Sequence, residues 1–233
     1  MASKGADVIL GCRDEKKGKS AAESISKTVK GDSKVQYRVL DLSDFRSIRN
    51  FASGIDHCDI LINNAGAMFP KHELVSFGSS TIEKTMLTNY LGPFYLTMKL
   101  LPLLLKPSCY STESGSSSSI SFERRIVNVG SRLEKTSSFR GLSPQNAVIN
   151  DIIRDSIIRG NHKISGDSGK ITYNMWTAYA NSKLCNLLFT FELSRKLAEG
   201  SFGQQLVGEL QPGTTPPLSV NAGGVVVYKS YLC

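Results

Sequence analysis

The stretch CDILINNAG, residues 58–66, carries an apolar core that Asn, Asn and Gly bring to an end. A short apolar run bounded by turn-forming residues is typical of a buried strand. Comparable runs occur earlier, at residues 6–12 and 35–42, and later, at residues 125–131. Segments with helical spacing separate these runs, and strands that alternate with helices predict a parallel sheet covered by helices. We therefore expect an α/β fold.

Helices are expected between and after these strands. The charged stretch that follows residue 14 has helical character, and Ser43 is expected to cap a second helix. The apolar positions that this second helix should bury are Phe45, Ile48 and Phe51. Longer helices are expected at residues 81–106 and at about residues 177–197, where apolar residues recur at helical spacing.

The length of 233 residues suits one domain, and we expect residues 1–233 to form it. Two stretches interrupt the alternation of strands and helices. Residues 107–123 are Ser-rich and predict a mobile surface loop. Residues 132–174 form an insertion, within which VINDIIRDSIIRG has the spacing of a short amphipathic helix.

Composition excludes several classes of protein. The formal charge is +8, but Lys and Arg are scattered, and no aromatic-rich basic strand or recognition-helix pattern indicates nucleic-acid binding. The five cysteines are widely spaced and form no Cys-x-x-Cys motif. Neither a disulfide framework nor a zinc site is therefore indicated, and no metal is expected.

The start of the chain, MASKGADVILGCRD, lacks the charged, apolar and small-residue sections of a signal peptide. The most apolar run, residues 96–105, is interrupted by proline and too short to span a bilayer. We expect a cytoplasmic protein without an integral membrane segment.

Polar and small residues follow each expected strand, where an open parallel sheet binds its ligands. These residues are Arg13, Asp41, Leu42, Asn63, Asn64, Ala65, Gly66, Gly130 and Ser131. Each has an ordinary structural explanation when taken alone. Asn-Asn-Ala-Gly suits a turn, an Asp at a strand end commonly caps a helix, and an isolated Arg is commonly solvated.

The stretch TAYANSKLCNLL places Tyr179 and Lys183 four residues apart on an expected helix. Residues at this spacing share a helix face, so the Lys183 ammonium can lie near the Tyr179 oxygen. An adjacent positive charge would lower the phenol pKa from its ordinary value and suit Tyr179 for proton transfer. A Tyr-Lys pair at this spacing also arises by chance, so both interpretations stay open on these residues alone.

The order of these motifs is more specific than any one of them. The segments GADVILGCRD, DILINNAG, TNYLGPFYLT, RIVNVGS and YANSKLCNLL occur in this order, and together they resemble the short-chain dehydrogenase/reductase family, particularly its retinol-dehydrogenase-like branch. The resemblance covers most of residues 1–200. It implies a Rossmann-like, doubly wound parallel sheet and hydride transfer between a nicotinamide cofactor and a small alcohol or carbonyl substrate.

The resemblance also implies a role for each site residue. Tyr179 would be the acid–base residue, Ser131 would donate to the substrate oxygen, and Lys183 would hold the nicotinamide ribose. Asn89 would kink its helix and hold a water of the proton relay. The implied cofactor-binding residues are Arg13, Asp41, Leu42, Asn63, Ala65, Gly66, Tyr179 and Lys183.

Arg13 stands where a ribose-binding acid would otherwise lie. A guanidinium at that position suits a 2′-phosphate, so the implied cofactor is NADP rather than NAD. Asp14, which follows directly, is the opposing feature. In the family, the helices that correspond to residues 94–106 and 179–197 commonly pair across an interface, so a homodimer is possible.

The chain differs from the family pattern at both ends and is expected to be truncated there. The sequence contains no Thr-Gly-x-x-x-Gly-x-Gly motif, and the strand that precedes it in the family would lie between the strands at residues 6–12 and 58–63. Without that strand, these two would leave backbone groups unpaired or would pair with each other. Residues 218–224 resemble the start of the sixth strand. The alternative to an NADP-dependent oxidoreductase is a catalytically inactive family member, or an incomplete gene product, that serves as a binding or scaffold protein.

Overall fold

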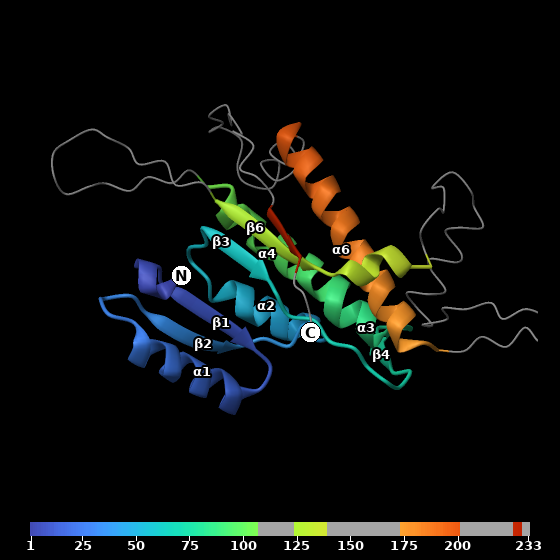
Figure 1. Cartoon of the computed structure of the whole chain (residues 1–233), viewed down its shortest axis with the longest axis horizontal. Helices are drawn as coiled ribbons and strands as arrows, with labels where there is room; N and C mark the ends of the chain where they lie inside the picture. Colours follow the sequence, from blue (N-terminus) through green and yellow to red (C-terminus); the bar gives the residue numbers. More distant parts are fainter. Residues whose placement is uncertain (107–123, 139–172, 201–225, 230–233) are drawn as a thin grey trace, which may run out of the picture. The chain divides into compact units, whose positions relative to one another are not determined.

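The computed structural model describes residues 1–106, 124–138, 173–200 and 226–229 (Figure 1). These fall into two compact units, Met1–Asp56 and His57–Cys233. Both units contain parallel strands flanked by helices, which confirms the expected α/β fold. The expected single domain stays a prediction, and the Ser-rich stretch, the amphipathic segment and residues 218–224 lie outside the described residues.

The first unit is a two-stranded parallel sheet with two helices. Strands β1 and β2 run in register from Val8 opposite Val35 to Cys12 opposite Val39. The elements, in order, are η1 (Ala2–Lys4), β1 (Val8–Cys12), α1 (Glu15–Thr28), β2 (Val35–Val39) and α2 (Phe45–Ser53).

Helix α1 begins directly after Asp14 because the Asp14 carboxylate accepts a hydrogen bond from the backbone N–H of Lys17 at 2.9 Å. This contact satisfies one of the free N–H groups of the first helical turn. The helix packs closely on β2 at Gly18, where any Cβ atom would collide with the ring of Tyr37. A glycine at this position therefore brings α1 near the sheet.

The cap of α2 is Asp44, so the expectation that Ser43 caps it is wrong. The Asp44 carboxylate accepts from the N–H of Arg46 at 2.8 Å. Ser43 is engaged elsewhere, since its hydroxyl donates to Asp41 at 2.6 Å. Of the three apolar positions expected inside, Ile48 is fully buried, and Phe45 and Phe51 are half-buried.

In the second unit, the described residues form a parallel sheet of three strands in the order β3-β6-β7. Their bounds are Ile60–Asn63, Arg125–Gly130 and Val226–Lys229. Strand β7 lies later in the chain than the strand expected from residue 218 onward. Among the described residues, β1 pairs only with β2, and β3 pairs only with β6.

A β-hairpin separates β3 from the first long helical segment. Strands β4 (Leu74–Phe77) and β5 (Ser80–Glu83) are antiparallel, and Gly78 adopts the positive φ of 59° that their tight turn requires. The helix expected from residue 81 therefore begins only at Lys84. Glu83 is buried and caps it, because its carboxylate accepts from two backbone N–H groups.

This helical segment consists of three parts, α3 (Lys84–Met86), the π-helical turn η2 (Leu87–Leu91) and α4 (Gly92–Leu104). The other helices that the structure describes in this unit are η3 (Arg132–Thr136) and α6 (Met175–Ala198). Helix α4 packs against β3, and α6 packs against β6 and η2 (Figure 1).

The core of the second unit lies between the sheet and these helices. Its buried apolar side chains include Leu61, Met86, Leu96, Leu100, Leu101, Ile126, Val127, Ala178 and Leu193. None of the helices within the described ranges is long and apolar enough to cross a membrane.

Candidate active site

Tyr179 and Lys183 lie one turn apart on α6, as the sequence predicts. The helix begins at Met175 because the side chain of Asn174 accepts from the N–H groups of Trp176 and Thr177. Tyr179 and Lys183 are each only 3% exposed. The Lys183 Nζ lies 5.6 Å from the centroid of the Tyr179 ring and donates to the carbonyl of Val129 at 3.0 Å.

Burial dominates the ionisation of both groups. It raises the pKa of the Tyr179 phenol above its ordinary value, and a hydrogen bond with Ser131 only partly offsets this rise. Burial lowers the pKa of the Lys183 ammonium. The net direction for Tyr179 is therefore opposite to the lowering that its spacing from Lys183 suggests.

Ser131 is the residue that leads from β6 into η3. Its hydroxyl oxygen accepts from the N–H of Leu133 at 3.3 Å, and the Glu134 carboxylate accepts from the N–H of Ser131 at 3.3 Å. This reciprocal capping box fixes the Ser131 side chain at the carboxyl end of β6. Because Ser131 lowers the pKa of the Tyr179 phenol, the two hydroxyl groups lie near each other although they belong to different elements.

Asn89 lies in the π-helical turn, which is the interruption of the helix that the resemblance implies. Its buried side chain accepts from the N–H of Ala67 at 2.8 Å and donates to the Ala67 carbonyl at 2.9 Å. It also donates to the hydroxyl of Ser182 at 3.1 Å. Asn89 therefore ties the segment after β3 to α6, next to Lys183.

The segment after β3 contains the expected Asn63, Ala65 and Gly66. The Asn63 side chain turns into the unit, where it donates to Thr97 at 3.0 Å and to Asn128 at 2.8 Å. Ala65 and Gly66 are exposed. A Cβ atom at Gly66 would lie 3.2 Å from the Lys183 Nζ, so glycine lets the backbone come close to this ammonium.

Buried polar residues behind the site were not predicted from the sequence. Asn128 donates to the Thr190 hydroxyl at 2.9 Å, and Thr190 donates to the carbonyl of Asn186 at 2.7 Å. Asn181 accepts from the hydroxyl of Ser137 at 2.7 Å. The sequence does place polar residues at positions of β6 and α6 where apolar residues would be expected, and this pattern could have revealed them.

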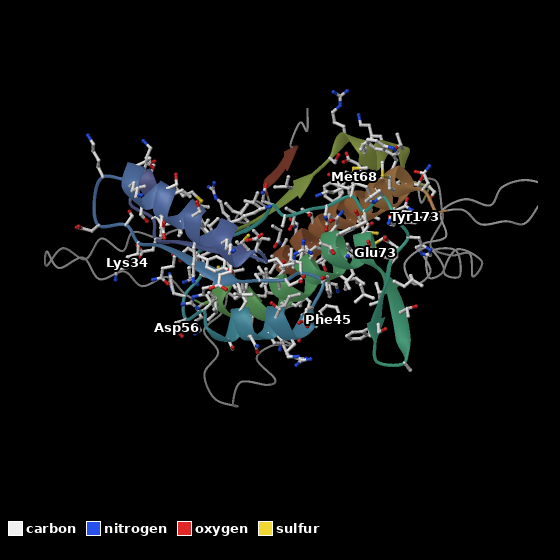
Figure 2. The ribbon with its side chains drawn as sticks, turned by 90° about the horizontal axis from the view of Figure 1, so that it is seen from below. Lys34, Phe45, Asp56, Met68, Glu73 and Tyr173 are labelled. Carbon is white, nitrogen blue, oxygen red and sulfur yellow. The ribbon has the colours of Figure 1, made fainter. Side chains whose placement is uncertain are left out.

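Tyr173 fixes the start of α6 and was not predicted either (Figure 2). Its hydroxyl donates to the carbonyl of Phe69 at 2.8 Å and lies 3.2 Å from the Thr85 hydroxyl. The ring stacks on His72 with 5.1 Å between centroids. Burial raises the Tyr173 pKa, so its phenol holds the Phe69 segment as a neutral donor.

The other expected residues, Arg13, Asp41 and Leu42, belong to the first unit. The Asp41 Oδ1 accepts from both the N–H and the hydroxyl of Ser43, at 2.8 and 2.6 Å. Arg13 is exposed at the end of β1, and the neighbouring Asp14 carboxylate caps α1. Asp14 is therefore engaged with the helix backbone.

Comparison with known proteins decides which family has this arrangement. The family model described as short chain dehydrogenase matches residues 1–140. This chain belongs to the short-chain dehydrogenase family. Human retinol dehydrogenase 11 is 36% identical to this dehydrogenase-family chain over 201 residues, which are 84% of the chain and 50% of that protein. The expected resemblance to the retinol-dehydrogenase-like branch is confirmed.

Solved structures agree with the fold. A crystal structure of an uncharacterised protein from Mycobacterium paratuberculosis shares 32% identity and a TM-score of 0.58, and covers 86% of this chain and 56% of that one. A short-chain dehydrogenase from Sphingobium yanoikuyae in complex with NADPH has a TM-score of 0.54 at 18% identity, with 86% of this chain and 59% of that one covered. The expected Rossmann-like fold is confirmed. The dehydrogenase-family chain spans about half the length of the curated relatives that it matches.

Proposed function

We propose that this chain is an NADP-dependent oxidoreductase that transfers a hydride between the nicotinamide and an alcohol or carbonyl substrate. The observation that carries the proposal is that Tyr179 and Lys183 are buried on one face of α6, 5.6 Å apart from ring centroid to Nζ, with the buried Ser131 close enough to the phenol to lower its pKa. An apolar alcohol or aldehyde is the proposed substrate class, because named relatives are retinol dehydrogenases.

The two hydroxyl groups can both act on the oxygen of the substrate. The raised pKa keeps the Tyr179 phenol protonated at neutral pH, so it can donate a proton to the oxygen of a carbonyl undergoing reduction. The Ser131 oxygen accepts from a backbone N–H, and its own hydrogen, which lies toward the Tyr179 oxygen, can turn to a substrate oxygen placed there and stabilise its negative charge. In alcohol oxidation the same groups would act in reverse.

The residues around Lys183 fit a nicotinamide cofactor. Glycine at position 66 lets the backbone lie close to the Lys183 Nζ, and the exposed Gly66 backbone offers a ribose a place beside this ammonium. When bound, NADPH would supply the hydride. We assign the preference for NADP to Arg13, because Asp14 is occupied as a helix cap and Arg13 is exposed.

Exposed apolar side chains on α4 and α6 support the proposed homodimer. Leu188 and Phe191 are 56% and 62% exposed, and Phe94 packs edge-on against Phe189 with 5.0 Å between centroids. Cytoplasmic location stays a prediction. Size-exclusion chromatography with light scattering would test the dimer, which a monomer at micromolar concentration would contradict.

A binding or scaffold protein is the second candidate, because the sequence contains no Thr-Gly-x-x-x-Gly-x-Gly motif for the cofactor pyrophosphate. An NADPH titration followed by calorimetry separates the two functions. We expect a Kd below about 1 mM, within the usual range of enzyme–substrate affinities. Tyr179→Phe should bind comparably, because the Lys183 contact is retained. No binding at near-millimolar NADPH would refute the oxidoreductase and favour the scaffold.

A further inference from the structure

The Asn89 carbonyl lies where the π-helical turn passes into α4, whose α-helical register begins at Gly92. In an α-helix the carbonyl of a residue accepts from the N–H four positions later. Four positions after Asn89 is Pro93, which has no N–H. In the α-helical register this carbonyl therefore has no backbone donor, and Asn89 itself is fully buried.

Asn186 supplies a donor from another helix. Its side-chain amide donates to the Asn89 carbonyl at 2.8 Å, and both residues are buried. Asn186 lies on α6 three positions after Lys183, so the two share a helix face. The carbonyl of Asn186 is itself held by Thr190, whose hydroxyl also accepts from Asn128 on β6.

The position of Asn89 matters for Lys183. The Asn89 side chain forms hydrogen bonds with both the N–H and the carbonyl of Ala67. The neighbouring Gly66 lies close to the Lys183 Nζ. A turn that shifted at Asn89 would carry this backbone away from the ammonium. The amide of Asn186 is thus connected to the proposed site by contacts that the structure shows at each step.

We propose that Asn186 is a positioning residue, which replaces the N–H that Pro93 lacks and thereby fixes Asn89 and the backbone beside Lys183. Asn186 is buried and its side-chain amide is bound to Asn89, so we assign it no contact with substrate or cofactor. The effect on catalysis rests on the proposed function, whereas the replacement of the missing N–H does not.

A double-mutant cycle tests this directly. Asn186→Leu removes the donor at similar volume, and Pro93→Ala restores a backbone N–H at the position that lacks one. We expect Asn186→Leu to lower kcat for aldehyde reduction about tenfold or more with KM nearly unchanged, since an interaction away from the substrate is lost. Pro93→Ala alone should be nearly neutral, and the double variant should recover most of kcat.

Thr190→Val is the matched control. It removes buried hydrogen bonds on the same face of α6 but does not contact the Asn89 carbonyl. Pro93→Ala should therefore fail to rescue it. Equal kcat for Asn186→Leu and wild type, or no recovery in the double variant, would overturn the proposal.

Hydrogen exchange gives a readout that does not need turnover. In Asn186→Leu, the amides of residues 84–95 and of Ala67 should exchange about tenfold faster or more, because a buried acceptor has lost its partner. Pro93→Ala should restore the slow exchange. If Asn186→Leu does not fold, Asn186→Ser, whose hydroxyl is too short to reach, replaces it in the cycle.

The two readouts also separate the two proposals. A wild-type chain without turnover would refute the proposed oxidoreductase, and the exchange cycle would still decide the role of Asn186. Unchanged exchange in the Asn186 variant, or exchange that Pro93→Ala does not restore, would overturn the inference on its own.

Discussion

Replacement of Asn89 by alanine should destabilise the second unit substantially. The side chain is fully buried and makes three hydrogen bonds, to the N–H and carbonyl of Ala67 and to the hydroxyl of Ser182. These bonds join the segment after β3 to α6. Alanine cannot form any of them, and the buried partner groups would be left without Asn89.

The expected loss follows from these contacts. A hydrogen bond contributes about 1 kcal/mol of net stability, so three lost bonds predict a decrease of about 3 kcal/mol in the free energy of unfolding. The hydrogen bond from the Asn186 side chain to the backbone carbonyl of Asn89 does not depend on the Asn89 side chain and should survive. A loss of this size is a large fraction of the stability of a typical domain, which is about 5–15 kcal/mol.

Urea unfolding followed by fluorescence measures this loss. Trp176, at the start of α6, is the sole tryptophan, so the signal reports on the second unit. Asn64→Ala is the control, since Asn64 is exposed and should change stability by no more than about 0.5 kcal/mol. A loss below about 1 kcal/mol for Asn89→Ala, or one equal to that of the control, would refute the structural role of Asn89.

Three further predictions follow from burial and charge. Lys183→Met should raise the free energy of unfolding by about 1 kcal/mol, because burial disfavours the ammonium and lowers its pKa. The same variant should lose turnover. A destabilised variant in urea unfolding would contradict this prediction. Burial raises the pKa of Cys58 to about 11 and of Cys185 to about 12. Because the unfolded chain releases these protons at lower pH, their contribution to stability should be full below about pH 8.5 and should fall as pH rises toward those values. Urea midpoints measured between neutral and alkaline pH check this, and Ala variants of the two cysteines should flatten the dependence. Arg13→Ala should raise the KM for NADPH about tenfold or more and leave that for NADH nearly unchanged, because only NADPH loses a charge-assisted hydrogen bond; equal effects on both would remove Arg13 from phosphate recognition.

Local patterns were enough to predict the main strands and the long helix. The apolar run that became β6 is mostly buried, whereas in β3 Leu61 is buried and Ile62 is 45% exposed. Tyr179 and Lys183 share a face because the period of the helix dictates it. Ser131 follows from its place at the end of a strand.

The features that the sequence did not predict depend on contacts between elements that are distant in the chain. The residues Thr81–Glu83 look helical, but they pair with β4, and Glu83 becomes a buried cap. Asn63 turns inward because Thr97 and Asn128 offer it partners from two other elements. The pKa direction of Tyr179 depends on burial, which spacing from Lys183 does not reveal.

The most direct test of the proposed activity compares wild type with Tyr179→Phe. Purified protein is mixed with NADPH and an apolar aldehyde, and loss of NADPH absorbance is followed together with alcohol formation. We predict turnover by the wild type and a loss of at least about a hundredfold in Tyr179→Phe, as expected when the acid–base group is removed. Equal rates for the two proteins would contradict the role of Tyr179, and no turnover by the wild type with any aldehyde would contradict the activity itself.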